Sequence, residues 1–461
     1  MFSEFYGSLR GWGSLDTWIV LTGAIAAMSC ALPGTWLLLR RQSLLGDALS
    51  HSILPGIVLA YLILHSLESA AWLTPESGSR HLVLFFGAAV SGVISAILTE
   101  LIQRWGRLDR GAAIGVIYTT MFALGLLMIR MFADQTHVDP SCVLYGNLET
   151  SAMVSGDSSF QAPQAVVVNG AILLINGLLV VAFFKELRLS TFDPGLAAAV
   201  GLSADWIQLC LMAMTAATLV AAFESVGAIL VIAMLIVPSA TARLLTDRLP
   251  VMLLITLVVA ALSALLGHVA ALTLPAMVFS RLGYSDVDGA STSGMMAVMA
   301  GVLFLTAIFC SPRHGAISRI RDQLRLRCRI AAEDLLGALY RRSESEPAEP
   351  STPLSSVATK YVDRLIDWFA RWRLERSGLI SIAGPNVLLT DKGRDFAQNL
   401  VRSHRLWETY MARHFDLPGD HLHAAAEQVE HFLSPEMQTE LAAELDQPDV
   451  DPHGKSIPRS N

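Results

Sequence analysis

The chain has 461 residues, 53% of them hydrophobic and only 16% charged, and its formal net charge at pH 7 is −7. A soluble domain usually carries about a quarter charged residues, so the composition argues against a wholly soluble protein. The negative charge argues against nonspecific binding of nucleic acid by the whole chain. The five cysteines form no CxxC pair, which argues against a disulfide framework and a thiolate zinc site.

Apolar runs fill the chain from Ile19 to Phe309, and charged residues return after Pro312. Because a helix needs roughly 20 apolar residues to cross a bilayer, these runs predict an all-α polytopic membrane protein with about eight or nine transmembrane helices. The number depends on the tight turn at 223–225. The predicted membrane segments are 18–39, 44–65, 82–103, 112–131, 165–184, 205–223, 225–245, 250–273 and 294–310.

The basic residues between these segments predict the orientation of the chain. One set of loops is richer in arginine and lysine, and that side of a membrane protein is usually cytoplasmic. We therefore expect a multi-pass protein of the cell (inner) membrane, with its N-terminus outside and everything after Pro312 in the cytoplasm. The richer loops carry Arg40, Arg41, Arg104, Arg107, Arg110, Lys185, Arg188, Arg243 and Arg248, and the poorer side carries Arg10, Arg80, Arg130 and Arg281.

The second predicted segment begins with two polar residues. Asp47 and His51 are four residues apart, so on a helix they share one face. A carboxylate with an imidazole suits Zn²⁺, Mn²⁺ or Fe²⁺. Pro55-Gly56 would interrupt the helix beside them and free backbone groups, which only protein or a water-filled cavity tolerates. The pair indicates a path for metal ions, and the alternative is a helix-start aspartate with a histidine bonded to a nearby carbonyl.

A short helix is predicted between the fifth and sixth segments. Asp193 suits its N-cap, Pro194 its first turn and Gly201 its end. Such a helix on the cytoplasmic face would let a permease take up motion from an ATPase, although any interfacial helix would have the same pattern. On the other side, the long loop 134–163 is either a landing surface for a partner or an ordinary exposed loop.

The nucleotide-binding pattern GxxxxGK followed by Ser or Thr does not occur in the sequence. We therefore expect this chain to bind no nucleotide and not to be an enzyme. If it belongs to an ATP-driven transporter, an ABC ATPase acts in trans.

The tail after residue 319 has the pattern of a small α+β region. A helix over 360–379 is followed by strand, turn and strand, and then by a helix that Thr390-Asp391 opens, which is typical of a winged helix. Helical patterns follow at 401–415, which holds His404, and at 422–432. The second contains Glu427, Glu430 and His431 at spacings of three and four, so they can converge on Mn²⁺, Fe²⁺ or Zn²⁺. Solvated helix charge is the alternative.

Four segments within about 15–315 resemble the permease family of ABC importers for zinc, manganese or iron. They are 46–56 (GDALSHSILPG), 137–147 with His137-Val138-Asp139, 226–243 (VGAILVIAMLIVPSATAR) and 311–315 (SPRHG). The resemblance implies that Asp47 and His51 line the metal route and that Asp193 to Gly201 is the helix coupled to the ATPase. It also implies three partners: ATPase subunits, an extracytoplasmic metal-binding protein and a second permease subunit, identical or different.

Residues 331–458 resemble the iron- and manganese-dependent repressors related to the diphtheria toxin repressor. The similar segments are 389–393 (LTDKG), 402–406 (RSHRL), 424–434 (AAAEQVEHFLS) and 451–458 (DPHGKSIP). The resemblance implies metal ligands at His404, Glu427, Glu430 and His431, and at Asp334 in an opening helix over 333–340. A further acidic ligand of the manganese type would fall on Gly337, which has no side chain to coordinate metal.

The segment that corresponds to the recognition helix of those repressors is 362–373. Arg364, Arg371 and Arg373 can meet phosphates. The remaining large side chains, Trp368, Phe369 and Trp372, are bulky for a major-groove surface and predict packing or dimer contacts instead. We therefore do not expect DNA as a partner.

These expectations divide the chain into a transmembrane permease domain (1–315), a connector (316–330), a winged-helix-like domain (331–395) and a helical metal-binding and dimerisation domain (396–461). The predicted function is the permease subunit of an ABC importer for divalent Mn, Zn or Fe. The metal would be its substrate and, in the cytoplasmic tail, its regulator. The alternatives are a membrane-tethered metal-dependent DNA-binding regulator and secondary transport without ATP.

Overall fold

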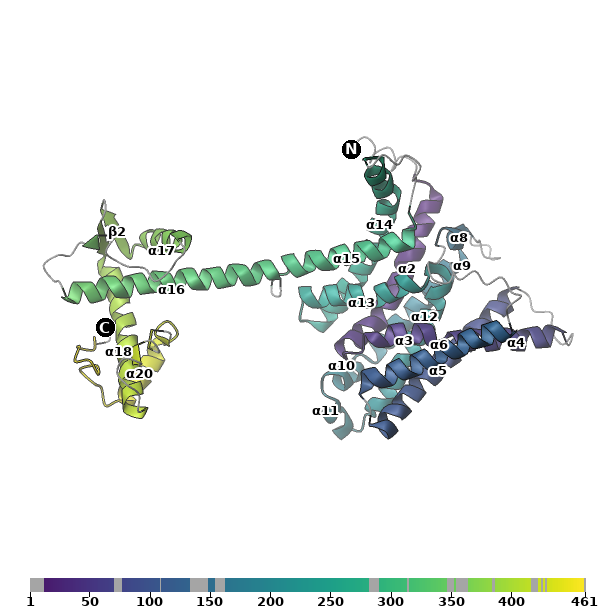
Figure 1. The fold of residues 1–461 in the computed structure, drawn as a ribbon, viewed down its shortest axis with the longest axis horizontal. Helices are drawn as coiled ribbons and strands as arrows, with labels where there is room; N and C mark the ends of the chain where they lie inside the picture. Colours follow the sequence, from purple (N-terminus) through teal and green to yellow (C-terminus); the bar gives the residue numbers. More distant parts are fainter. Residues whose placement is uncertain are drawn as a thin grey trace. The chain divides into compact units, whose positions relative to one another are not determined.

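The computed structural model describes residues 12–69, 77–107, 109–132, 148–153, 162–281, 290–312, 315–345, 352–353, 364–383, 386–415, 422–423, 426–427 and 429–459. The chain forms two compact units, Met1–Ser318 and Arg319–Asn461. Figure 1 shows the two units as ribbons. The segment 137–147 and most of the predicted external loop lie outside the described residues.

The first unit is helical in all its described elements. Eight helices are long and apolar enough to cross a membrane, and the described apolar part of α13, Leu230–Leu245, is shorter. This confirms the all-α polytopic fold. The helices are α2 (Ser14–Leu39), α3 (Leu44–Ser52), α4 (Leu54–Ser69), α5 (Ser77–Gly106), α6 (Arg110–Phe132), α8 (Leu148–Met153), α9 (Gln164–Ala182), α10 (Phe184–Phe192), α11 (Pro194–Ala199), α12 (Ala204–Val226), α13 (Ala228–Leu245), α14 (Leu249–Arg281) and α15 (Thr292–Cys310).

The tight turn between α12 and α13 is a single glycine. Gly227 has φ of +81° and is at once the C-cap of α12 and the N-cap of α13. Glycine has no Cβ, so it adopts this conformation without the strain that other residues incur. The two apolar runs are therefore separate helices.

Close backbone packing places α3 against the core of this unit. A Cβ on Gly34 of α2 would lie 1.8 Å from the Leu235 carbonyl oxygen of α13, and a Cβ on Gly46 of α3 would lie 2.0 Å from Leu235 Cδ2. Only glycine lets α2 approach the α13 backbone this closely, whereas a Cβ on Gly46 would have to displace the end of the Leu235 side chain. The start of α3, which carries Asp47, is thus held against the centre of the bundle.

Buried polar side chains also join the helices. Asn176 of α9 donates to the Thr218 hydroxyl of α12 at 2.8 Å and to the Ser29 carbonyl of α2 at 3.2 Å. The hydroxyls of Thr35 on α2 and Ser239 on α13 lie 3.1 Å apart. Such hydrogen bonds are a normal means of helix association in a bilayer, where apolar surfaces gain little by meeting.

The second unit combines helices with a small sheet, as predicted. Its sheet has the antiparallel order β1-β3-β2, with Ile380 opposite Leu389 and Ala383 opposite Asn386. Helix α18 runs without a break across residues 395–396, so the winged-helix and metal-binding regions share it. The elements are α16 (Ala316–Ser345), β1 (Thr352–Pro353), α17 (Arg364–Arg376), β2 (Ile380–Ala383), β3 (Asn386–Leu389), α18 (Asp391–His414) and α20 (Pro435–Glu444).

The core of the second unit joins α16 to α17 and the hairpin. It contains Ala331, Ala332, Leu335, Leu336, Leu339, Ile366, Ala370, Leu374, Ile380, Val387 and Ala397. On the other face of α17, Trp368, Phe369 and Trp372 are 59%, 49% and 46% exposed. These aromatic side chains therefore do not pack into the core of this unit.

Candidate metal sites

Asp47 and His51 face each other across one turn of α3. His51 Nε2 lies 3.7 Å from Asp47 Oδ1. The His51 side chain is 30% exposed and the Asp47 side chain is 46% exposed. The His51 ring lies against the rings of Tyr118 and Phe122 on α6, at centroid distances of 5.4 and 5.1 Å. The aromatic rings orient the imidazole while its nitrogen stays open. An ion can therefore reach both groups without unfolding the helix.

The helix breaks just after this pair, as predicted. The structure ends α3 at Ser52 and begins α4 at Leu54, and Pro55 has no N–H to donate to the His51 carbonyl. Gly56 N bonds to the Ile53 carbonyl at 3.0 Å, and the Ser52 carbonyl accepts from the Ser91 hydroxyl of α5 at 2.8 Å. The break thus leaves the His51 carbonyl without its usual helical donor, beside the Asp47–His51 pair.

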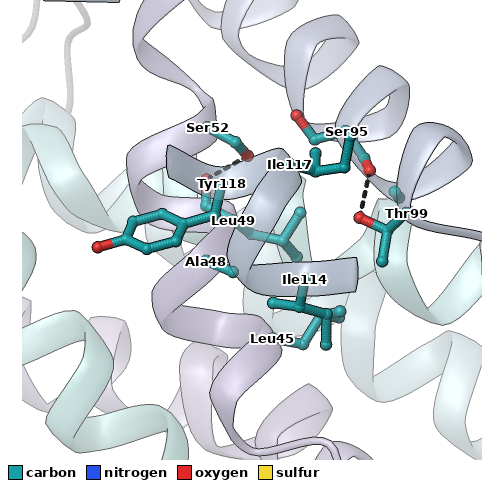
Figure 2. A pocket seen from close by; sticks show the side chains of 10 residues that line it. Leu45, Ala48, Leu49, Ser52, Ser95, Thr99, Ile114, Ile117 and Tyr118 are labelled. Atoms are coloured by element: carbon teal, nitrogen blue, oxygen red, sulfur yellow. Dashed lines mark hydrogen bonds between the residues drawn. The ribbon is translucent and has the colours of Figure 1, made fainter. Parts of the chain in front are cut away.

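A small pocket lies along a different side of α3, between α3, α5 and α6. Figure 2 shows Leu45 and Ile114 at one end and Ser52 and Ser95 toward the other. The described residues that line it include no charged side chain, and neither Asp47 nor His51 is among them. This pocket is therefore a packing gap and not a second ion site.

The predicted short helix is α11, and its ends have the expected form. Asp193 Oδ1 accepts from Leu196 N at 2.9 Å, Pro194 is the first helical residue, and Gly201 has φ of +86°. Leu196 and Val200 are 50% and 66% exposed. An anchored helix with apolar side chains in the open suits contact with another protein chain.

Arg40, at the end of α2, fastens this region to the bundle. Its guanidinium donates to the hydroxyls of Thr191 (3.1 Å) and Ser190 (2.7 Å), both on α10. It also donates to Gln208 Oε1 of α12 at 2.6 Å, and Gln208 donates in turn to Gln42 Oε1 at 2.6 Å. One side chain therefore joins α2, α10 and α12 directly before α11. No pattern in the sequence indicates this role for Arg40.

In the second unit, Asp334, Glu430 and His431 form a first group of candidate ligands. His431 Nδ1 lies 2.8 Å from Glu333 Oε2, while its Nε2 is buried and makes no well-aligned hydrogen bond. Carboxylate oxygens of Asp334 and Glu430 lie 3.2 and 3.8 Å from that Nε2. A carboxylate on one ring nitrogen that leaves the other facing two acidic oxygens is the usual arrangement around a metal-bound histidine. The donor set therefore fits a divalent transition metal.

His404, Glu408 and His423 form a second group. His404 Nε2, Glu408 Oε1 and His423 Nδ1 lie 2.9 to 3.1 Å from one another. Three atoms at such spacing can face one ion, and the mixture of nitrogen and oxygen suits Mn²⁺, Fe²⁺ or Zn²⁺. His404 Nδ1 lies 2.5 Å from Glu430 Oε2, so His404 and Glu430 link the two groups.

The buried carboxylates hold protons on both histidines. Burial opposes the charge on His404, but its hydrogen bonds with Glu408 and Glu430 prevail and raise its pKa to about 9. Burial likewise opposes the charge on His431, and its contacts with Asp334 and Glu333 raise its pKa to about 9. Since a metal-bound nitrogen carries no proton, an ion entering either group displaces protons.

The two groups contain four of the five predicted tail ligands. Asp334, Glu430 and His431 lie together, and His404 contacts Glu430, whereas Glu427 belongs to neither group. Glu408 and His423 were not among the ligands predicted from the sequence. Glu408 had a signal, because it lies four residues after His404 on one helix, but His423 had none.

A cavity of about 610 Å³ opens beside the first group. Glu333, Glu430 and His431 line it, together with Arg329 of α16 and Ser403 of α18. Ions can therefore reach the first group through a cavity that both polar and apolar side chains line.

Comparison with known proteins gives two family matches. The profile of the ABC 3 transport family matches residues 15–311. The profile of the iron dependent repressor, metal binding and dimerisation domain, matches residues 390–459. The first covers most of the helical unit, and the second covers α18 and the chain after it.

Individual relatives agree with the first match. The chain is 34% identical to the zinc transport system membrane protein TroD of Treponema pallidum, over 82% of this chain and 97% of that protein. It is 36% identical to the manganese transport system membrane protein MntD of Bacillus subtilis, over 66% and 95%. Among solved structures, PsaBC from Streptococcus pneumoniae in complex with Fab has a TM-score of 0.52 at 26% identity, over 68% of this chain and 98% of that chain.

Proposed function

The chain belongs to the ABC 3 transport family, and we propose that it is the permease subunit of an importer for divalent transition metal ions. Its relatives are named for manganese, zinc and iron transport, so we propose Mn²⁺, Zn²⁺ or Fe²⁺ as the substrate. The protein is multi-pass, and we place it in the cell (inner) membrane with its N-terminus outside and its tail in the cytoplasm. Its partners are an ABC ATPase, an extracytoplasmic metal-binding protein and a second permease subunit.

The observation that carries this proposal is the Asp47–His51 pair. A carboxylate oxygen and an open imidazole nitrogen lie 3.7 Å apart at the start of an apolar helix, and both remain partly exposed. Ionisable groups in membrane segments are costly and usually functional. With only two side-chain ligands, the pair would hold an ion weakly enough to release it, as transport requires.

The short helix α11, with Asp193 before it and Gly201 after it, supports the proposal that ATP hydrolysis in a partner chain drives transport. Helix α11 presents Leu196 and Val200 to the outside, and its Asp193 cap and Gly201 end fix its shape. The ATPase would press on α11, and Arg40 would pass the motion from α10 to α2 and α12. A transporter that works without ATP would not need an exposed helix such as α11 that is linked to the bundle through Arg40.

We further propose that the tail binds cytosolic metal and lowers transport when metal is plentiful. The supporting observation is the buried Nε2 of His431, which lacks a good hydrogen bond and faces Asp334 and Glu430. A divalent cation there would supply positive charge between the two carboxylates and join α16 to the segment after α18. The exposed Trp368 and Trp372 of α17 argue against the rival role as a DNA-binding regulator.

Metal uptake tests the transport proposal. Cells starved of Mn²⁺, Zn²⁺ or Fe²⁺ in turn would express the wild type, Asp47→Asn or His51→Gln at equal levels. Each variant should lower uptake of one metal by roughly tenfold or more, since each removes one of two side-chain ligands. Asp109→Asn is the control, because Asp109 is an exposed loop residue whose carboxylate accepts from Gly111 N at 3.0 Å, a bond that the asparagine oxygen can also accept. Unchanged uptake of all three metals in both variants would contradict the proposal.

A further inference from the structure

The first half of α16 is strongly basic. Residues 316–330 contain five arginines and one aspartate and no other charged residue, a net charge of +4 in a chain whose total is −7. All five arginines are exposed. Asp322 already pairs with Arg321 at 3.1 Å. Arg329 pairs with Glu333 at 2.8 Å. Among the ion pairs of the described residues, none includes the other three: Arg319, Arg325 and Arg327.

An uncovered apolar stripe runs along the same segment. Ile317, Ile320 and Leu324 are 57%, 56% and 47% exposed. Their spacing puts them on one face of the helix, and Arg321 and Arg327 lie on either side of that face. Further along, this face carries Ala331 and Leu335, which are buried in the core of the second unit. Among the described residues, nothing covers the first turns of the stripe.

The chain reaches this segment directly from a candidate membrane span. Helix α15 ends at Cys310 and α16 begins at Ala316. The connection is tight, because Gly315 N bonds to the Ser311 carbonyl at 3.1 Å and a Cβ on Gly315 would lie 2.4 Å from that oxygen. The Ser311 hydroxyl donates to the Leu244 carbonyl at the end of α13. The start of α16 is therefore held directly beside the ends of α15, a candidate membrane span, and α13.

We propose that residues 316–330 form an interfacial helix that binds anionic lipid headgroups. The arginines contact the headgroups, while Ile317, Ile320 and Leu324 enter the boundary with the acyl chains. A basic helix with an apolar stripe has the composition of helices that lie in a membrane surface, and clusters of arginine next to a span attract anionic lipid. A second copy fits worse, because pairing two such helices would bring two charges of +4 together.

The experiment uses the full chain in nanodiscs of phosphatidylcholine alone or of an equal mixture with phosphatidylglycerol. A nitroxide is placed at Leu324→Cys or, as the matched control, at Asp322→Cys, after all native cysteines have been replaced. Position 322 lies on the opposite side of the helix. In the mixture, the label at 324 should be more accessible to oxygen and less accessible to a water-soluble nickel chelate than the label at 322. In phosphatidylcholine alone this difference should shrink.

Neutralising the unpaired arginines provides the second measurement. Arg319→Gln, Arg325→Gln and Arg327→Gln together should weaken insertion on the order of a hundredfold, because each arginine near an anionic surface contributes about fivefold. Equal chelate access at 322 and 324 in both membranes would overturn the proposal. So would an immobile label at 324 with strong dipolar coupling between two chains, which would identify a second copy as the partner. Neither measurement depends on metal transport.

Discussion

At the scale of single residues, Arg40 decides how three helices are joined. Its planar guanidinium reaches two hydroxyls of α10 and the amide of Gln208 at once. A lysine keeps the charge, but its three donors share one nitrogen on a flexible stem, so it cannot reach all three acceptors in the fixed directions of the guanidinium. If an ATPase acts on α11 as proposed, Arg40 would be a positioning residue that transmits this motion from α10 to α2 and α12.

Arg40→Lys tests this role in the assembled transporter. We expect ATP hydrolysis to continue while the amount of metal transported per ATP falls severalfold, because α10 would move without α2 and α12. Arg243→Lys is the control, since Arg243 is exposed and its guanidinium bonds to Asp247 at 3.0 Å. A purely structural role would lower transport and hydrolysis together and leave their ratio unchanged.

Residue-level contacts also show why helical spacing accounts for only part of the candidate ligand groups of the tail. Glu427 and His431 have ideal helical spacing, yet the structure pairs His431 with Glu333, which is 98 positions away in the sequence. Residues 430–432 form a turn, so helical spacing does not govern the end of this segment. Periodicity identified the segment, but it could not identify the partners.

At the scale of elements, a glycine on α16 has room for a side chain, whereas a glycine on α18 is crowded by a neighbouring backbone carbonyl. A Cβ on Gly337 of α16 would meet Arg341 Nη2 at 3.4 Å and Leu400 Cδ2 at 3.5 Å, which are ordinary contacts. A Cβ on Gly393 of α18 would lie 1.9 Å from the Leu379 carbonyl oxygen. The first position tolerates a side chain, whereas the second requires its absence.

Gly337→Ala should therefore stabilise α16 by about 1 kcal/mol, because alanine is the better helix former. Gly393→Ala should destabilise the junction of the hairpin and α18. Amide hydrogen exchange of the full chain measures both effects: exchange in residues 331–345 should slow about fivefold in the first variant. Faster exchange in Gly337→Ala would contradict the prediction.

At the scale of the whole molecule, the proposed metal path and a candidate metal-binding tail occur in one chain. If the tail senses the transported ion, loss of its ligands should remove inhibition without removing transport. We expect Glu430→Ala with His431→Ala to keep uptake high in cells loaded with metal, where uptake by the wild type falls. The measurement is the initial rate of uptake against intracellular metal.

The control for that experiment is Glu436→Ala, which removes an exposed carboxylate in the first turn of α20. It should leave the response to metal unchanged. If the double variant is as sensitive to intracellular metal as the wild type, the tail does not regulate transport through this group.

Much of the molecule followed from the sequence by itself, because its signals are local. Apolar runs identified the membrane helices, and Asp193, Pro194 and Gly201 identified α11, because capping depends on a few neighbouring residues. The hairpin and the Thr390 cap of α18 were predicted for the same reason. Only the tertiary structure decided which distant groups meet. The Arg40 network, the pairing of His431 with Glu333 and the approach of His423 to His404 all join segments that local spacing does not relate. Such contacts arise when whole helices pack, so no pattern within one helix can determine them.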